Sequence, residues 1–347
     1  MRRRLQPLLA LAAVLALAPP ALAGAPSPLV ATRLTVANAA NLLFAGTDAD
    51  GGIDDWYLSN GIVELIVDDV GPQTDLPLGV TPPPKQSEAG FTGGSLIDFG
   101  LVGADNDQLV QVFTVGGLST SNFVLYDSIE AFPDPPIAKI VVTGRVLGFN
   151  VAPEDLEVVT EYSVAPGEPY ALVTTTVTNQ SAETALGLGG FLDVFLWTDK
   201  SFLPFSPIAG RGFDHPVIDL ANPVNSLDLS RFMAAVGSNG PADGTIDPQT
   251  GAVCGETSYG ILGLQALADP DGPGGVDPVA TPVNNLFGIS NHELSAFGNT
   301  PGNDVPAGGS LRYERRFYVT DRNSIASISN TMFTELAPRL GFETGTL

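Results

Sequence analysis

The segment Ala171-Leu-Val-Thr-Thr-Thr-Val-Thr178 indicates the fold class most directly. Its valines and threonines are branched at Cβ, a shape that suits the pleated surface of a β-strand. A second segment, Leu311–Val319, alternates in the manner of a strand with one wetter face. One side would carry Leu311, Tyr313, Arg315, Phe317 and Val319, and the other Arg312, Glu314, Arg316 and Tyr318. Both segments predict extended structure.

Further β-type runs recur along the chain, and most of its 39 glycines and 29 prolines fall between them. These runs are Val63–Val67, Gln108–Val115, Phe123–Tyr126, Ile137–Val146, Leu156–Val164, Leu186–Trp197 and Ser258–Leu267. One amphipathic helix is expected near the end, with apolar residues at helical spacing at Ile325, Ile328, Met332, Phe333 and Leu336. The pattern predicts an all-β protein, a large antiparallel β super-sandwich with long loops and one C-terminal amphipathic helix.

The predicted organisation has three parts. Residues 1–23 form a signal peptide, residues 24–340 a single β super-sandwich domain, and residues 341–347 a C-terminal tail. No linker-like stretch or fixed repeat divides the large part. Residues 199–255 are rich in Pro, Gly, Asn and Asp and are expected to form long, irregular loops.

The first 23 residues have the three parts of a secretion signal. Arg2–Arg4 form a positive start, Leu8–Ala18 an apolar run, and Ala21-Leu-Ala23 a cleavage motif. The alternative is a membrane anchor, but spanning takes about 20 residues, more than this run supplies. No second apolar run predicts a membrane span, and the residue directly after the cleavage motif is Gly24, not the cysteine of a lipoprotein. We therefore expect cleavage at Ala23–Gly24 and a protein secreted to the extracellular space or the periplasm.

The composition limits the partners. The net charge is −23, and loss of residues 1–23 removes three arginines and no acidic residue, which makes it −26. Such a surface repels nucleic acid and anionic membranes and attracts cations. Cys254 is the only cysteine, so an intramolecular disulfide is impossible. The oligomeric state is left open.

Two acidic, glycine-bent loops are candidate Ca²⁺ sites. Alternate carboxylates in such a loop can turn several oxygens toward one hard cation. Neither loop has the closing glutamate of an EF-hand, and the alternative is a pair of solvated turns. The candidate ligands are Asp48, Asp50, Asp54 and Asp55 in the first loop and Asp269, Asp271 and Asp277 in the second. Ca²⁺ would have a structural role, and no organic cofactor is expected.

A mixed polar and aromatic set is the candidate ligand site. It consists of Asp193, Trp197, Asp199, Arg211, Asp214 and His215. Aromatic faces stack on sugar rings while carboxylates and Arg bind hydroxyls, and two carboxylates at a suitable separation can hydrolyse a glycoside. The alternative is that Trp197 belongs to the core and the others decorate a loop. No catalytic residue is assigned, because the zinc, nucleophile-elbow and phosphate-loop motifs are missing.

Several stretches together resemble a known family. They are Gly51–Gly61, Gly93–Asp98, Asn106–Leu109, Tyr162–Pro169 with Thr174–Asn179, Leu188–Asp193, and Pro306–Val319 with Ile325–Ile328. They are similar to the N-terminal region of large secreted bacterial proteins. In that family a galactose-mutarotase-like β super-sandwich precedes carboxypeptidase-regulatory-like modules. The resemblance implies a super-sandwich and carbohydrate recognition. It brings no catalytic set, because the family's histidines and glutamate do not map onto His215 and His292.

The sequence is therefore consistent with three functions. The first is a secreted, non-catalytic protein that binds a polysaccharide, a cell-surface glycan or another extracellular surface, with Ca²⁺ as a structural aid. The second is a carbohydrate-active enzyme, a lyase, hydrolase or epimerase, with a cleft near Asp193–His215. The third is a structural module of an extracellular assembly.

Overall fold

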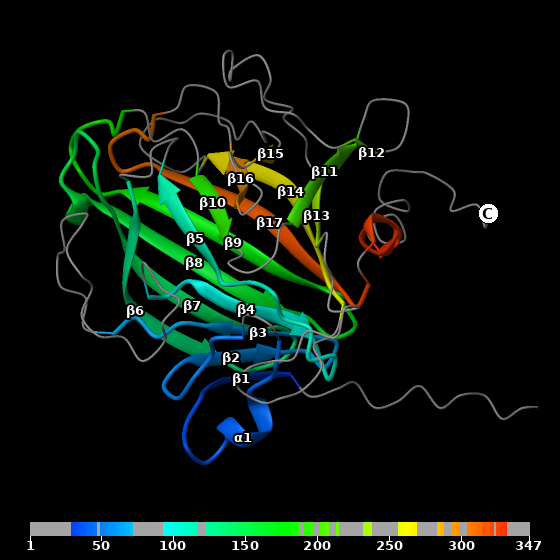
Figure 1. Cartoon of the computed structure of the whole chain (residues 1–347). Coiled ribbons are helices and arrows are strands. Elements are labelled where there is room, and N and C mark those ends of the chain that lie inside the picture. The colour runs from blue at the N-terminus through cyan, green and yellow to red at the C-terminus, as the bar shows by residue number, and fades with distance from the viewer. Residues whose placement is uncertain are drawn as a thin grey trace, which may run out of the picture.

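The computed structural model confirms the all-β fold class. The residues that it describes are 29–46, 49–71, 93–116, 122–186, 191–196, 202–207, 213–214, 232–237, 256–268, 283–287, 293–298, 304–322 and 324–331. Within them, the strands form two antiparallel sheets that lie face to face (Figure 1).

The first sheet has eight strands among the described residues, in the order β1-β2-β3-β4-β5-β10-β16-β15. Their bounds are β1 Val30–Arg33, β2 Trp56–Ser59, β3 Val63–Val67, β4 Leu96–Leu101, β5 Gln111–Gly116, β10 Phe191–Leu196, β16 Glu293–Gly298 and β15 Val283–Phe287. Strands β1 to β4 follow one another as simple antiparallel neighbours. Strand β10 then joins β5 from far along the chain, with Asp193 opposite Thr114.

The second sheet has nine strands among the described residues, in the order β12-β11-β13-β14-β17-β9-β8-β7-β6. Their bounds are β12 Phe213–Asp214, β11 Phe202–Pro207, β13 Phe232–Gly237, β14 Ser258–Ala268, β17 Ser310–Thr320, β9 Tyr170–Asn179, β8 Leu156–Val164, β7 Ala138–Val146 and β6 Val124–Phe132. The two segments that most strongly predict strands, 171–178 and 311–319, are the neighbours β9 and β17.

The main core lies between the sheets. Both contribute fully buried aliphatic residues, such as Leu58 and Leu65 from the first sheet and Ile140 and Val158 from the second. Along β7 the burial alternates between buried and partly exposed, as expected where one face packs on a core and the other meets water.

A chain of polar side chains crosses this apolar core. Arg315 of β17 forms an ion pair with Asp193 of β10, and its Nη1 donates to Thr175 Oγ1 at 2.8 Å. Thr175 Oγ1 lies 2.9 Å from Thr160 Oγ1, which lies 2.7 Å from the Tyr126 hydroxyl. Each member is therefore hydrogen-bonded, as buried polar groups require.

Smaller clusters cover the outer faces. Leu34, Tyr57, Ile66 and Ile97 lie together on the outer face of the first sheet, near the short helix α1 (Ala39–Leu42). On the second sheet, Tyr170 and Tyr318 pack with Ile328 of a helix at 325–331. The expected C-terminal helix is thus present with Ile328 buried, while Met332, Phe333 and Leu336 lie outside the described residues. A short 3₁₀ turn, η1 (Pro153–Asp155), precedes β8.

The region 199–255 differs from the expectation of irregular loops, because β11, β12 and β13 lie within it. The apolar runs that form β11 and β13 are short, and β11 contains Pro204 and ends at Pro207. Proline disfavours a strand reading because it cannot donate to the ladder. Here Pro204 pairs with Ala235 of β13 in the second sheet.

No helix among the described residues is long and apolar enough to cross a membrane.

Candidate functional site

A partly exposed cluster of charged and aromatic side chains lies at one end of the first sheet. Strand β1 ends at Arg33, β2 begins at Trp56, and β3 ends at Val67, and the antiparallel register places these three residues side by side. Directly opposed residues project from the same face of a sheet. Ala31 and Leu58 of the same two strands face the core. Arg33 and Trp56 therefore lie on the core-facing side at the ends of their strands, where Trp56 packs against the core.

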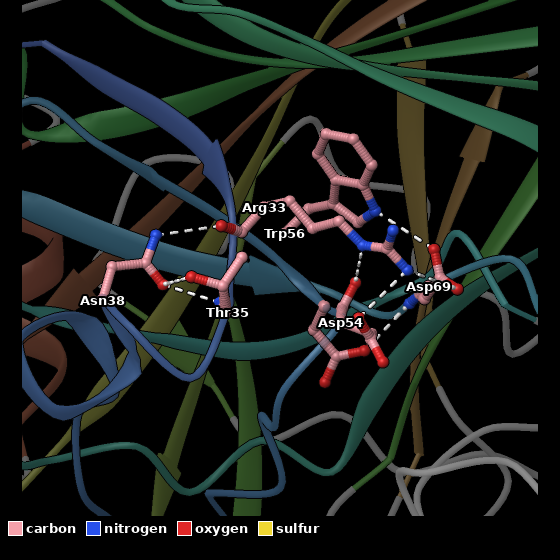
Figure 2. Close-up of polar contacts among 7 residues, drawn as sticks. Arg33, Thr35, Asn38, Asp54, Trp56 and Asp69 are labelled. Carbon is pink, nitrogen blue, oxygen red and sulfur yellow. Dashed lines mark hydrogen bonds and ion pairs between the residues drawn. The ribbon is translucent and has the colours of Figure 1, made fainter.

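Asp54 and Asp69 complete the cluster, which we call the Arg33–Trp56 site (Figure 2). The Arg33 guanidinium lies over the indole of Trp56, 5.9 Å from the ring centroid. Its Nε donates to the Asp54 carbonyl oxygen at 3.1 Å, and its Nη2 lies 3.2 Å from Asp54 Oδ1. The same Nη2 lies 3.7 Å from Asp69 Oδ2, while the indole Nε1 donates to Asp69 Oδ1 at 3.2 Å.

The site remains open to solvent. The side chains of Arg33, Asp54 and Asp69 are 46%, 39% and 28% exposed, respectively. Ion pairs at this exposure are worth only about 0–1 kcal/mol each. The charged groups of the site are therefore only weakly paired and stay accessible to solvent.

The backbone on the Arg33 side is braced by a local turn. The Asn38 side chain donates to the Arg33 carbonyl oxygen at 3.0 Å and accepts from the Thr35 amide at 2.6 Å. The Thr35 hydroxyl donates to the same Asn38 oxygen at 3.1 Å (Figure 2). This side-chain turn holds the chain where it leaves β1.

The loop that carries Asp54 is anchored by two buried carboxyls. Asp98 of β4 accepts from the amides of Asp50 and Gly51, both at 2.9 Å. Asp55 accepts from the Gly52 amide at 2.8 Å and the Asp69 amide at 3.0 Å. These bonds tie the Asp54 loop to β4 and to the chain after β3.

Asp54 itself adopts a left-handed backbone conformation with φ of 84°. This conformation is uncommon for a residue with a Cβ and costs energy unless the surroundings impose it. Here the Asp54 amide donates to the Leu34 carbonyl oxygen at 2.9 Å, and its own carbonyl oxygen accepts from Arg33. Both ends of the residue are thus held by the chain in and after β1.

Burial dominates the electrostatics of the two anchoring carboxyls. Loss of hydration raises the pKa of Asp55 to about 7, despite the amides of Asp69 and Gly52, which act in the opposite direction. Burial also raises the pKa of Asp98 well above its usual value, opposed by the Asp50 amide. Neighbouring carboxylates add to both shifts, because like charges disfavour ionisation.

The acidic loops predicted to bind Ca²⁺ are only partly described. Asp48, Asp269, Asp271 and Asp277 lie outside the described residues. In the first loop, Asp54 faces Arg33 and Asp55 faces backbone amides. Among the described residues, no group of three or more His, Cys, Asp or Glu side chains is arranged to hold a metal ion. The Ca²⁺ sites stay predictions.

The predicted ligand set is also only partly described. Asp193 is the member whose side-chain surroundings the structure describes, and it is not at the surface. Asp193 is fully buried between the sheets, where it accepts from Thr114 Oγ1 at 2.8 Å and from Arg315 Nη2 at 2.7 Å. A sugar cannot reach this carboxylate in the folded chain. Asp214 lies in β12, whereas Trp197, Asp199, Arg211 and His215 lie outside the described residues.

The sequence pattern indicates Asp54 as an ion ligand but does not indicate Arg33 or Asp69 as site residues. Arg33 and Trp56 meet only because β1 pairs with β2, and 22 residues, which include helix α1, separate those strands in the sequence. The sequence does contain a signal for Arg315, because this charged residue falls on the apolar side of the alternation in 311–319. In the structure it pairs with Asp193.

Comparisons with known proteins leave the family open. No protein-family model matches the chain, and no curated protein matches its sequence. Solved structures with a similar arrangement include an alpha-galactosidase from Lactobacillus brevis, with TM-score 0.42, 12% identity, and coverage of 86% of this chain and 44% of that one. A GH36 alpha-galactosidase from Geobacillus stearothermophilus has TM-score 0.40 and 11% identity, over 80% of this chain and 39% of that one.

An alpha-mannosidase from Enterococcus faecalis V583 has TM-score 0.43 and 8% identity, over 81% of this chain and 31% of that one. This chain therefore spans less than half of each of these three proteins. At TM-scores below 0.5 the likeness carries no inference about activity, and the β-sandwich assignment rests on the two sheets themselves.

Proposed function

We propose that this chain is an exported, non-catalytic β-sandwich protein that binds carbohydrate at the Arg33–Trp56 site. The observation that carries the proposal is the composition of that site. A partly exposed indole lies beside a guanidinium and two carboxylates that the backbone holds in place. Aromatic faces pack on the C–H faces of sugars, while Arg and Asp exchange hydrogen bonds with hydroxyl groups.

Export is the other part of the proposal, and the sequence of residues 1–23 supports it. The test is expression of the full chain in a bacterium, followed by N-terminal sequencing of the protein recovered outside the cytoplasm. We expect a start at Gly24. Retention of the uncleaved chain in the cytoplasm would contradict export.

The binding test measures retardation of the folded protein in gels that contain soluble polysaccharides. Trp56→Ala should weaken binding at least about tenfold, the effect of removing an aromatic anchor from a binding site. Trp56 also packs on the core, so the melting temperature of the variant is measured alongside. Loss of binding counts only at temperatures where the variant is folded.

The chain supplies a matched control on the other sheet. Phe132 is 37% exposed and carries Lys139 over its ring at 5.4 Å, while the ammonium of Lys139 lies 3.0 Å from Glu161. This cluster has an aromatic ring, a cation and a carboxylate in a different place. Phe132→Ala should leave carbohydrate binding unchanged. If no polysaccharide of any class retards the protein, the binding proposal is wrong.

We also propose that Ca²⁺ stabilises the fold at the loops 48–55 and 269–277. The support is electrostatic. The exported chain would carry a net charge of −26, and Asp55 and Asp98 are buried beside further carboxylates, which raises their pKa values. A divalent cation bound near these groups would relieve the repulsion.

A further inference from the structure

The turn between β2 and β3 contains a chemically reactive pair, Asn60-Gly61. Glycine has no Cβ to keep its backbone nitrogen from approaching the side chain of a preceding asparagine. The Gly61 nitrogen can attack Cγ of Asn60 and form a C–N bond, while the Cγ–Nδ2 bond breaks and ammonia leaves with the proton of the Gly61 amide. Water then opens the cyclic imide at either carbonyl, which leaves aspartate or isoaspartate at position 60.

The folded turn opposes the attack. The Gly61 amide, which must lose its hydrogen, donates it to Ser59 Oγ at 3.0 Å. Asn60 Oδ1 accepts from the amides of Ile62 and Val63 at 2.9 and 3.0 Å. Attack would turn the planar carboxamide into a tetrahedral centre, so closure of the imide ring disturbs both of these bonds. Asn60 is only 2% exposed, which leaves water little access to assist the reaction.

The leaving group is also held. Asn60 Nδ2 donates to the carbonyl oxygens of Ala165 and Glu168 in the β8–β9 turn, at 2.7 and 2.8 Å. Departure of Nδ2 as ammonia would break both bonds and leave two carbonyl oxygens without this donor in a buried place, which is costly. The reaction therefore requires the two turns to separate first.

The products do not fit the native turn. A carboxylate at position 60 has no N–H to give, and it would face the carbonyl oxygens of Ala165 and Glu168, acceptor against acceptor. Isoaspartate adds a methylene group to the main chain next to Gly61, whose left-handed φ of 80° shapes the turn. Either product opposes the docking of the β2–β3 turn on the β8–β9 turn.

We propose that Asn60 is a deamidation site that the native fold closes, and that its deamidation in an unfolded chain prevents return to the native structure. The reaction cannot be reversed by refolding, because the ammonia is lost. The time that a chain spends unfolded thus decides whether it can still fold. The inference is independent of the proposed carbohydrate-binding function.

The first experiment compares the folded full chain with the same chain in guanidinium chloride, both at mildly alkaline pH. Peptide mapping by mass spectrometry follows deamidation at Asn60. We expect the rate to be at least about tenfold lower in the folded protein, because the site reacts only when it opens. In the denaturant, Asn60 should react at a rate comparable to that of Asn239-Gly240, the other Asn-Gly pair of the sequence.

The second experiment asks which chains can refold. Samples held in the denaturant for increasing times are diluted into buffer, and the compact fraction is collected by gel filtration. Aspartate and isoaspartate at position 60 should be depleted at least about tenfold from the compact fraction relative to the whole sample. A parallel sample held unfolded at mildly acidic pH, where the backbone nitrogen attacks slowly, should keep the refolding yield of the zero-time sample.

A pair of variants isolates the effect of the product. Asn60→Asp should lower the equilibrium constant for folding at least about tenfold. Asn150→Asp is the control and should change it far less, because the Asn150 side chain is exposed. Asn60 deamidating equally fast in the folded and unfolded chain would overturn the protection. Modified chains refolding in full proportion, or an Asn60→Asp variant as stable as the unchanged protein, would overturn the block to folding.

Discussion

Arg315 and Asp193 form an ion pair between the two sheets, in which both side chains are essentially inaccessible to solvent, at 1% and 0% exposure. The guanidinium uses Nε and Nη2 for the carboxylate, with Nη2 donating to Oδ1 at 2.7 Å. Thr114 Oγ1 donates to the same Oδ1 at 2.8 Å. The pair therefore has the bidentate geometry and additional bonds that a buried charge pair needs.

Breaking this pair should destabilise the protein strongly. Arg315→Met or Asp193→Ala leaves one buried charge without its partner, and each should lower the free energy of unfolding by about 3–5 kcal/mol. The double variant Asp193→Leu with Arg315→Met removes both charges and should lose less than the sum of the single variants. Urea denaturation gives all of these values.

The exposed pair Arg145–Asp127 is the control, with 3.4 Å between Nη1 and Oδ2 and side chains 30% and 53% exposed. Asp127→Ala should cost no more than about 1 kcal/mol. Equal losses at the buried and exposed pairs would contradict the structural role of Arg315.

Asn60 should be a second point of high sensitivity. Its Nδ2 donates to the carbonyl oxygens of Ala165 and Glu168, at 2.7 and 2.8 Å, and its Oδ1 accepts from the amides of Ile62 and Val63. It thereby joins the β2–β3 turn to the β8–β9 turn across the sandwich. Asn60→Ala should lower the free energy of unfolding by about 1–3 kcal/mol, measured by urea denaturation.

Asn150 is a comparable asparagine at an exposed position, where it bonds to the Thr184 carbonyl oxygen and the Leu186 amide. Asn150→Ala should have a clearly smaller effect, because water can replace those bonds. A loss at Asn150 as large as that at Asn60 would argue against the link between the turns.

Gly144 of β7 should not tolerate a side chain. It lies opposite Tyr126, beside the bulge between Tyr126 and Ser128 in β6. A Cβ there would lie 1.9 Å from the Leu125 carbonyl oxygen, which is backbone and cannot move aside on its own. Gly144→Ala should lower the free energy of unfolding by about 3 kcal/mol.

Gly52 is the matched comparison for that substitution. The nearest atom to a Cβ at Gly52 is Asp55 Oδ2 at 3.7 Å, an ordinary contact. Gly52→Ala should leave the urea midpoint almost unchanged. A tolerated alanine at Gly144 would show that β6 and β7 do not pair closely at the bulge.

Mild acidification should stabilise the protein. The pKa of Asp55, about 7, and that of Asp98, also raised, exceed the value of about 3.9 expected for an unfolded chain, so the folded state binds protons more tightly. The free energy of unfolding should therefore rise as the pH falls from about 7.5 toward 5. For each group the slope approaches about 1.4 kcal/mol per pH unit. This stability is lost again as the pH rises through 7.

Asp55→Asn should reduce that slope, because asparagine cannot titrate. Asp127→Asn removes a carboxylate of the same kind from an exposed position and should leave the slope as it is. Denaturant titrations at several pH values provide the measurement. A protein that becomes less stable between pH 7.5 and 5 would contradict the raised pKa values.

Calcium should raise the melting temperature. A ligand that binds only the folded state stabilises that state. The stabilisation grows with the logarithm of the ratio of the ligand concentration to the dissociation constant once the ligand is in excess of that constant. We expect a higher Tm in millimolar Ca²⁺ than in a chelator, and Asp50→Asn together with Asp271→Asn should shrink the difference. Identical melting curves with and without the ion would reject the proposal.

Strands with a continuous apolar run or a long regular pattern could be predicted from the sequence, and the site could not. Strands β3 and β8 match their predicted bounds, and β9 and β17 differ from theirs by a residue at each end. Each of these strands contributes several apolar residues to the same core. Strands such as β1 and β2 have four residues each, too few for a periodicity to emerge.

Asp193 shows that residue type alone can also indicate a binding residue where the structure has none. Its carboxylate lies on a predicted strand segment beside apolar residues, and the partner that makes it structural, Arg315, is 122 residues away in the chain. Residue type alone suggested a ligand site. Only the face-to-face placement of β10 and β17 distinguishes a buried ion pair from a binding residue.

The position of β17 in the second sheet has a consequence for the order of folding. This strand comes late in the sequence, yet it lies between β14 and β9, and it carries Arg315. Until it is inserted, β9 and β14 have unpaired edges and Asp193 has no counter-charge. Contacts between such distant segments form slowly. The chain would thus remain incompletely folded until β17, the last strand in sequence among the described residues, is available, and the exposed strand edges are open to aggregation meanwhile.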